Sequence, residues 1–208
     1  MLELYLIRHP ETTAIENQRV AGHQNTTLKK GWEAKVDALT EKLAAYGPFD
    51  AIYAGDLDRT DLPASKLHYS LRKAQRQIHH PISYHPTPLL KERNFGVWEG
   101  QRYRFVIKGD KQDIFEYLFF LPNILNGESH DDIRHRVKKL REELQKYEEK
   151  GRLGIVSSNG FLNYLRNDTV RGDILAGGYR RMQNLEIALI RIEPTPEGPK
   201  AEEVPLAA

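Results

Sequence analysis

The chain has 208 residues, 39% of them hydrophobic and 29% charged, and it contains no cysteine, which excludes disulfide bonds, thiolate zinc sites and a thiol nucleophile. Because 31 basic residues are balanced by 29 acidic ones, the net charge of +2 gives no reason to expect nucleic acid as a partner. No apolar run approaches the roughly 20 residues of a membrane helix, and the N-terminus shows no secretory signal, so we expect a cytoplasmic protein with no membrane partner.

Short apolar runs alternate with segments of helical periodicity along most of the chain. The first strand is expected at residues 2–7, a nearly continuous apolar run typical of a strand buried on both faces. The clearest helical spacing covers residues 129–150, where Ser129 and Asp132 have the spacing of a capping box. Further strands are expected at residues 49–54, 81–85, 153–156 and 185–192, and further helices at 29–46, 59–76 and 161–170, with 101–121 helical in part and 11–28 a long loop.

Strands that alternate with helices predict an α/β fold, with a mostly parallel sheet covered by helices on both faces in three αβα layers. The sequence shows no internal repeat, and we expect a single domain over residues 1–192. Residues 193–208 are rich in Pro and Glu, and we expect them to form a disordered tail. The sequence leaves open whether the protein is a monomer or a homodimer.

The expected first strand ends at Arg8, His9 and Pro10, within the stretch LYLIRHPET. Ligands of open α/β sheets bind in the crevice at the carboxyl ends of the strands, so the Arg-His pair is expected where chemistry takes place. A neutral imidazole can attack phosphorus, and a guanidinium offers a planar set of donors to phosphoryl oxygens. Taken alone, the pair could equally end a strand at the surface, and the motifs that follow decide between the two interpretations.

Further motifs fall where strands end or loops meet: YAGDLDRTDLPA at 53–64, LKERNFGVWEG at 90–100, NGESHDDIRHRV at 126–137 and GIVSSNGFLNYL at 154–165. With the first motif, their order and spacing resemble the histidine phosphatase superfamily from the expected first strand, at residues 2–7, to residue 185. Loop residues agree with that family at Asn17, Arg19, Gly22, Leu28 and Gly31. The resemblance implies a phosphoglycerate mutase-like fold and a phosphatase that acts on a small phosphomonoester, with neither a cofactor nor a metal ion.

By motif position, the resemblance implies that His9 is the nucleophile and carries the phosphoryl group as a phosphohistidine. It implies that Glu92 is the general acid that protonates the leaving alcohol and then the base that activates water. Arg8 and Arg59 are implied to bind the phosphoryl oxygens, whose negative charge grows in the transition state. Asn17 either contacts phosphate or only stabilises its loop, and the sequence leaves both interpretations open.

The chain departs from the family pattern at two points. Pro10 stands where the first motif usually has glycine, whereas Ser158 replaces the second phosphate-binding histidine and Asn159 replaces a glycine. Ser158 and Asn159 can donate hydrogen bonds to a phosphoryl oxygen but carry no positive charge, and losing one charge-assisted donor costs on the order of 10²–10³ in rate. Either these residues serve an active though weak enzyme, or the chain is an impaired relative that binds phosphorylated ligands or a protein partner. A phosphoglycerate mutase is the least favoured alternative.

The motifs do not fix the substrate. Residues 101–126 contain many aromatic side chains, of which we expect most to pack, and Phe95 and Trp98 are expected to pack in their loop. Positive charge at Arg102, Arg104 and Lys108 would suit a second anionic group, as in a sugar phosphate or a nucleotide-like substrate. His130 and His135 diverge on their predicted helix, which makes them a poor metal pair, and we expect both at the surface.

Overall fold

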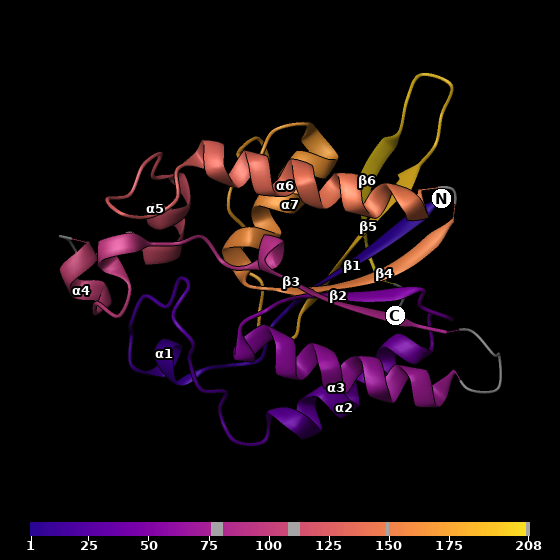
Figure 1. Ribbon diagram of the computed structural model, residues 1–208, viewed down its shortest axis with the longest axis horizontal. Helices are drawn as coiled ribbons and strands as arrows, with labels where there is room; N and C mark the ends of the chain where they lie inside the picture. Colours follow the sequence, from indigo (N-terminus) through magenta and orange to yellow (C-terminus); the bar gives the residue numbers. More distant parts are fainter. Residues whose placement is uncertain (76–80, 108–112, 149, 207–208) are drawn as a thin grey trace.

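The computed structural model describes residues 1–75, 81–107, 113–148 and 150–206, and a six-stranded sheet forms its centre (Figure 1). The strand order is β3-β2-β4-β1-β5-β6. Strands β1, β4, β2 and β3 run parallel, whereas β5 is antiparallel to β1 and β6 is antiparallel to β5. The strands are β1 Leu2–Arg8, β2 Ala51–Gly55, β3 Ser83–Thr87, β4 Gly151–Ser157, β5 Ile187–Glu193 and β6 Lys200–Val204.

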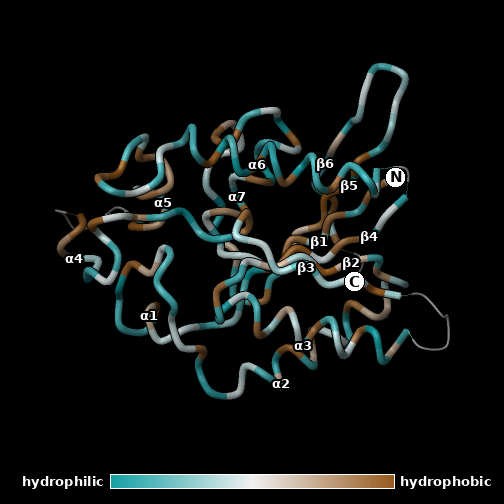
Figure 2. The backbone as a smooth tube through the Cα atoms, viewed as in Figure 1, coloured by the Kyte–Doolittle hydropathy of each residue, from teal (hydrophilic) through white to brown (hydrophobic). Residues whose placement is uncertain are grey.

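Helices cover both faces of this sheet, as predicted. On one face lie α2 (Trp32–Ala44) and α3 (Asp58–Ala74), and on the other lie α6 (His130–Leu144) and α7 (Asn159–Arg171) (Figure 1). Alternate residues of β1 serve the two faces, because Leu4 packs with α6 and α7 while Tyr5 packs with α2 and α3. Figure 2 shows the hydrophobic residues concentrated in the central strands, and burial on both faces accounts for the nearly continuous apolar sequence of β1, in which Glu3 and the terminal Arg8 are the charged residues.

Short elements gather beyond one end of the sheet, where β1 ends at Arg8 (Figure 1). The predicted loop 11–28 contains one turn of helix, and the predicted helical region 101–121 contains two separate helices within its described residues. No helix of the described residues is long and apolar enough to cross a membrane. These short elements are α1 Thr13–Glu16, η2 Pro88–Leu90, η3 Gly96–Trp98, α4 Tyr103–Val106 and α5 Ile114–Phe120. A further short helix, η4 Gln145–Tyr147, lies at the opposite end of the sheet, just before β4.

The capping box predicted at the start of α6 is confirmed, with Ser129 and Asp132 bonding each other's backbone N–H groups. The expectation that His130 lies at the surface is wrong. This side chain is buried, and its Nε2 donates to the carbonyl oxygen of Phe119 at 2.9 Å. The reason is tertiary, because α5 packs over the first turn of α6 and supplies a carbonyl acceptor that the helix itself does not contain.

The expected disorder of residues 193–208 is wrong for Lys200–Val204, which form β6. This strand pairs with β5 from Leu189 opposite Val204 to Glu193 opposite Lys200. Without β6, the outer edge of β5 would present unpaired backbone N–H and C=O groups, and pairing satisfies them even when the pairing strand is polar. A composition rich in Pro and Glu describes the polarity of a segment, but it does not reveal whether a neighbouring strand offers an edge.

Candidate active site

A small cavity, open to solvent, lies at the carboxyl ends of β1 and β4. Among the described residues, no three His, Asp or Glu side chains gather in a way that could hold a metal ion. Most of the predicted site residues line this cavity, namely Arg8, His9, Arg59, Glu92, Ser158 and Asn159.

His9 is 5% exposed, and its protonation state follows from its contacts. Its Nδ1 lies 2.6 Å from the carbonyl oxygen of Pro10. A carbonyl can only accept, so Nδ1 carries the proton and Nε2 keeps its lone pair. Burial, followed by the positive charges of Arg59 and Arg8, holds the pKa of His9 well below its usual range. The site therefore contains a neutral imidazole with a free nitrogen lone pair.

The backbone around His9 is held from both sides. Its N–H donates to the carbonyl oxygen of Ser157 at 3.0 Å, in β4, and its own carbonyl accepts from Asn184 Nδ2 at 2.8 Å. Arg8 donates through Nη1 to the carbonyl oxygen of Met182. The Nε of Arg8 is buried and has no hydrogen-bond partner within the described part of the chain. An anionic ligand in the cavity could meet this unsatisfied donor.

Arg59, near the start of α3, is 2% exposed and anchors a loop. Nη1 donates to the carbonyl oxygen of Gln24 at 2.7 Å, and Nη2 donates to that of Gly22 at 2.5 Å. Nε donates to Ser158 Oγ at 3.4 Å. Burial lowers the pKa of Arg59 from its high usual value. The guanidinium has further N–H donors for a ligand, but much of its bonding already fixes the loop over the site.

The loop that Arg59 holds requires glycine at position 22. Gly22 has φ +52°, and a Cβ atom there would lie 2.0 Å from Oε1 of Glu99. That oxygen accepts from the backbone N–H groups of His23 at 2.7 Å and Phe95 at 3.0 Å. A side chain at position 22 would therefore disturb both the loop and the Glu99 carboxylate beneath it.

Glu92 lies at the N-terminus of α7, where two backbone N–H groups bond its carboxyl. Oε2 accepts from Gly160 at 3.1 Å, and Oε1 accepts from Arg93 at 2.8 Å. Ser158 is the N-cap residue of α7, but its side chain makes no capping bond. Glu92 thus accepts a bond from a first-turn N–H group of α7 in place of the missing cap. A Cβ atom at Gly160 would lie 2.4 Å from Oε1 of Glu92, so glycine permits this approach.

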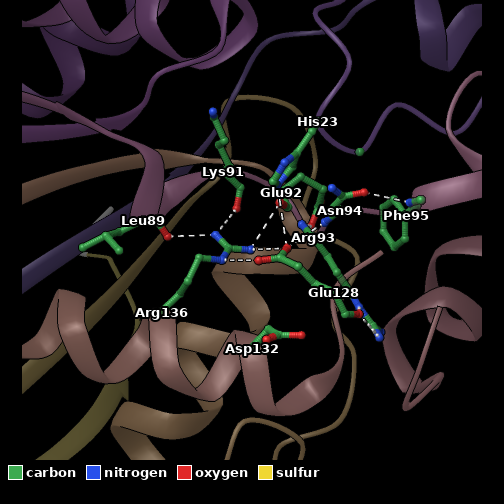
Figure 3. A network of polar contacts seen from close by, with 12 residues as sticks. His23, Leu89, Lys91, Glu92, Arg93, Asn94, Phe95, Glu128, Asp132 and Arg136 are labelled. Atoms are coloured by element: carbon green, nitrogen blue, oxygen red, sulfur yellow. Dashed lines mark hydrogen bonds and ion pairs between the residues drawn. The ribbon is translucent and has the colours of Figure 1, made fainter. Parts of the chain in front are cut away.

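Sequence reasoning missed the side chains that fix the backbone at Glu92 (Figure 3). Arg136 of α6 donates through Nη1 to the carbonyl oxygens of Leu89 and Lys91, both at 2.9 Å. Its Nη2 donates to the Glu92 carbonyl at 3.3 Å and to Glu128 Oε2 at 2.9 Å. Arg136 lies within the motif at 126–137, which is the one signal that could have set it apart from the surface charges of α6.

Two further residues complete this support. His23 donates through Nε2 to the Glu92 carbonyl oxygen at 2.8 Å (Figure 3). Arg93, which follows Glu92 in the chain, is fully buried. Its guanidinium donates to backbone carbonyls of the α5 end and the loop before α6, at Leu118, Leu121, Pro122 and Glu128. The segment 89–94 is therefore held by two arginines: Arg136 bonds its carbonyl groups from α6, and Arg93, within the segment, bonds carbonyl groups outside it.

The structure places the two predicted asparagines differently. Asn159 lines the cavity, but its Nδ2 donates to the Tyr179 hydroxyl at 2.7 Å and the Arg180 carbonyl at 3.1 Å. Its Oδ1 accepts from the backbone N–H of Met182 at 2.9 Å, so the side-chain amide ties α7 to residues 179–182. Asn17 is exposed at the C-terminal end of α1 and does not line the cavity.

Aromatic side chains of α4 and α5 also line the cavity, together with Phe95. The expectation that Phe95 only packs in its loop is therefore incomplete. Arg102 and Arg104 do not line the cavity, and Arg104 lies over the ring of Phe105 at 4.9 Å. Lys108 lies outside the described residues. The structure thus gives no support to a second anion site built from these cations.

Comparison with known proteins gives a consistent result. Residues 4–204 match the family model described as histidine phosphatase superfamily, branch 1. No curated protein sequence matches the chain. The fold is similar to a mycobacterial glucosyl-3-phosphoglycerate phosphatase solved with VO3, with TM-score 0.77 and 18% identity, covering 99% of each chain. It is also similar to the alpha-ribazole phosphatase from Shigella flexneri, with TM-score 0.71 and 22% identity, covering 97% of this chain and 95% of that one.

Proposed function

The chain belongs to the histidine phosphatase superfamily, and from this membership we propose that it is a phosphatase that hydrolyses a small phosphomonoester through a phosphohistidine at His9. The observation that carries the proposal is the buried, neutral imidazole of His9, whose Nδ1 proton is bonded to the Pro10 carbonyl. Its Nε2 lone pair is then free for attack on phosphorus. The glucosyl-3-phosphoglycerate phosphatase and the alpha-ribazole phosphatase of similar fold support the same reaction class.

In the first step, His9 Nε2 forms a bond to phosphorus while the bond from phosphorus to the ester oxygen breaks. Glu92, in its protonated form, gives its proton to the departing oxygen, and the alcohol leaves. In the second step, the Glu92 carboxylate takes a proton from water as the water oxygen attacks phosphorus. The bond from phosphorus to Nε2 then breaks, which releases orthophosphate and restores neutral His9 and protonated Glu92.

Positive charge at the cavity would stabilise the transferring phosphoryl group. Arg8 has a buried Nε without a partner in the described chain, and a phosphoryl oxygen would satisfy it. Arg59 keeps N–H donors beyond those that hold the loop. We assign Asn159 a positioning role, because its amide is already bonded to residues 179–182. The Ser158 hydroxyl accepts a bond from Arg59 and keeps its own O–H to donate to a phosphoryl oxygen, but it adds no positive charge.

The test is release of inorganic phosphate from a panel of phosphomonoesters by wild type, His9→Ala and His68→Ala. His68 is a matched control, because it donates to the Ile82 carbonyl at 3.0 Å and does not line the cavity. We expect release by wild type and His68→Ala and none by His9→Ala. Equal rates for His9→Ala and wild type would contradict the phosphohistidine mechanism.

A second candidate function is a catalytically impaired relative that binds phosphorylated ligands or a protein partner. The observation in its favour is Ser158, an uncharged residue beside Arg59 where the family motif has histidine. The distinguishing variant is Ser158→His. If wild-type protein binds orthophosphate but releases none from any ester, and Ser158→His gains turnover, the second candidate is supported over the first.

A further inference from the structure

The cavity has two chemically different parts. One part holds His9 and the two arginines, and the other is formed by apolar and aromatic side chains from elements beyond the end of the sheet (Figure 1). If phosphate binds at His9, as proposed above, the alcohol of the ester must extend into the second part. The residues of this part used below, which we call the aromatic wall, are Ile15, Val20, Tyr103, Phe115, Leu118 and Phe119.

The aromatic wall is packed in place. Phe119 is 2% exposed and stacks on Tyr164, with ring centroids 4.3 Å apart. Phe115 meets Tyr103 edge to face at 5.4 Å. Leu118 is buried in a cluster with Val20, which joins α5 to the loop after α1. A ligand would therefore find apolar surface already formed, without first ordering these side chains.

Spare charge is scarce around the aromatic wall. Arg181 pairs with Asp113 at 3.3 Å, and its guanidinium lies 5.6 Å from the Phe115 ring centroid. Among the arginines that line the cavity within the described residues, Arg19 is the one besides Arg8 and Arg59. Its side chain is exposed, so water screens its charge, and its Nη1 is bonded to the Gly100 carbonyl. A polyhydroxylated alcohol would lose its bonds to water here and find few replacements.

Tyr103 contributes the one unsatisfied polar atom of the aromatic wall. Its hydroxyl is buried and has no hydrogen-bond partner in the described part of the chain. Burial raises the pKa of Tyr103 to about 12, so the hydroxyl stays neutral and adds no charge to the wall. Such a group can bond a single polar atom of a ligand, which is the usual arrangement of a specific apolar pocket.

We propose that this protein selects phosphomonoesters of apolar alcohols that carry an aromatic ring, with the ring packed against Phe115, Tyr103 and Leu118. The proposal deepens the phosphatase function and rests on it, because the phosphate at His9 fixes which end of the ligand enters the aromatic wall. A sugar phosphate or a phosphorylated hydroxy acid, whose alcohol is polar, is the disfavoured class.

The first test compares kcat/KM for 2-phenylethyl phosphate and glycerol 3-phosphate. Both are esters of primary alcohols, so the comparison reports mainly on contacts to the alcohol. We expect wild type to prefer the phenyl ester by about tenfold or more, the scale on which buried apolar groups discriminate substrates. An equal kcat/KM for the two esters, or a higher kcat/KM for glycerol 3-phosphate, would overturn the proposal.

The matched variants are Phe115→Ala, within the aromatic wall, and Phe105→Ala, whose ring is 67% exposed and does not line the cavity. We expect Phe115→Ala to reduce the phenyl preference about tenfold with little change for glycerol 3-phosphate, and Phe105→Ala to leave it unchanged. Thermal unfolding of both variants checks that they fold. A preference that survives in Phe115→Ala, or is lost equally in both variants, would contradict the assigned ring position.

Binding separates this proposal from the proposed function. Calorimetry would compare 3-phenylpropylphosphonate with 3,4-dihydroxybutylphosphonate, which replace the ester oxygen of the two substrates by CH₂ and cannot be hydrolysed. Tighter binding of the phenyl compound without phosphate release from any ester would support the aromatic wall and reject the phosphatase. Turnover with tighter binding of the dihydroxy compound would support the phosphatase and reject the aromatic wall.

Discussion

Gly160 controls the position of the proposed acid. It is the second residue of α7, and its N–H bonds Oε2 of Glu92. In Gly160→Ala, the new Cβ would lie 2.4 Å from Oε1 and 2.9 Å from Oε2. Ordinary van der Waals contact begins at 3.4 Å. The carboxyl is the end of a flexible side chain, so it will move away while the backbone of α7 stays in place.

The required shift of the carboxyl is about 1 Å, which is enough to reduce kcat about 10²-fold when the displaced group takes part in the reaction. Stability should change little. Replacing glycine by alanine in a helix contributes up to about 1 kcal/mol, and losing the bond from Gly160 to Glu92 costs about 1 kcal/mol. We therefore expect a folded protein with the unfolding temperature of wild type and a much lower kcat.

The assay is steady-state phosphate release together with thermal unfolding, for Gly160→Ala, Glu92→Gln and the double variant. If Gly160→Ala acts through Glu92, the double variant will be no slower than Glu92→Gln alone. Thr169→Ala is the control in the same helix, because Thr169 does not line the cavity. A full kcat in Gly160→Ala beside an impaired Glu92→Gln would refute the reasoning, as would losses that multiply in the double variant.

Other predictions concern pH, positioning and the sheet. Because the folded state keeps His9 neutral, the unfolded chain binds more protons below about pH 6.5, so stability should fall as pH drops. The free energy of unfolding should fall less steeply with decreasing pH in His9→Asn than in wild type. Denaturant titrations at several pH values measure both slopes, and equal slopes would contradict this prediction. Arg136→Ala should lower kcat about tenfold with KM unchanged, because it releases the backbone at Glu92, whereas an effect on KM alone would argue for a different role. Glu3 is buried and pairs with Arg152 and Arg191, both of which are partly exposed. Glu3→Ala should therefore lower the free energy of unfolding by about 1–2 kcal/mol without changing kcat.

Much of the fold was predictable because it depends on local patterns. The apolar run of β1, the helical spacing of α6 and the Ser129–Asp132 capping box each involve residues within a few positions of one another. The same holds for the position of His9, since the end of an apolar strand and the start of a polar segment are adjacent in the chain. Such features are set by side-chain periodicity and capping, which the sequence records directly.

Features that depend on distant partners were decided by the tertiary structure. The amide of Asn159 is bonded by residues about 20 positions later, and Arg136 reaches carbonyls more than 40 positions earlier. Neither partner can be read from the neighbouring residues. Residues 200–204 form β6 because they pair with the edge of β5. The packing of α4 and α5 turns Tyr103 and Phe115 toward the cavity. Local periodicity therefore determined most of the strands and helices, whereas long-range pairing decided β6, and long-range hydrogen bonding and packing decided which residues serve the site.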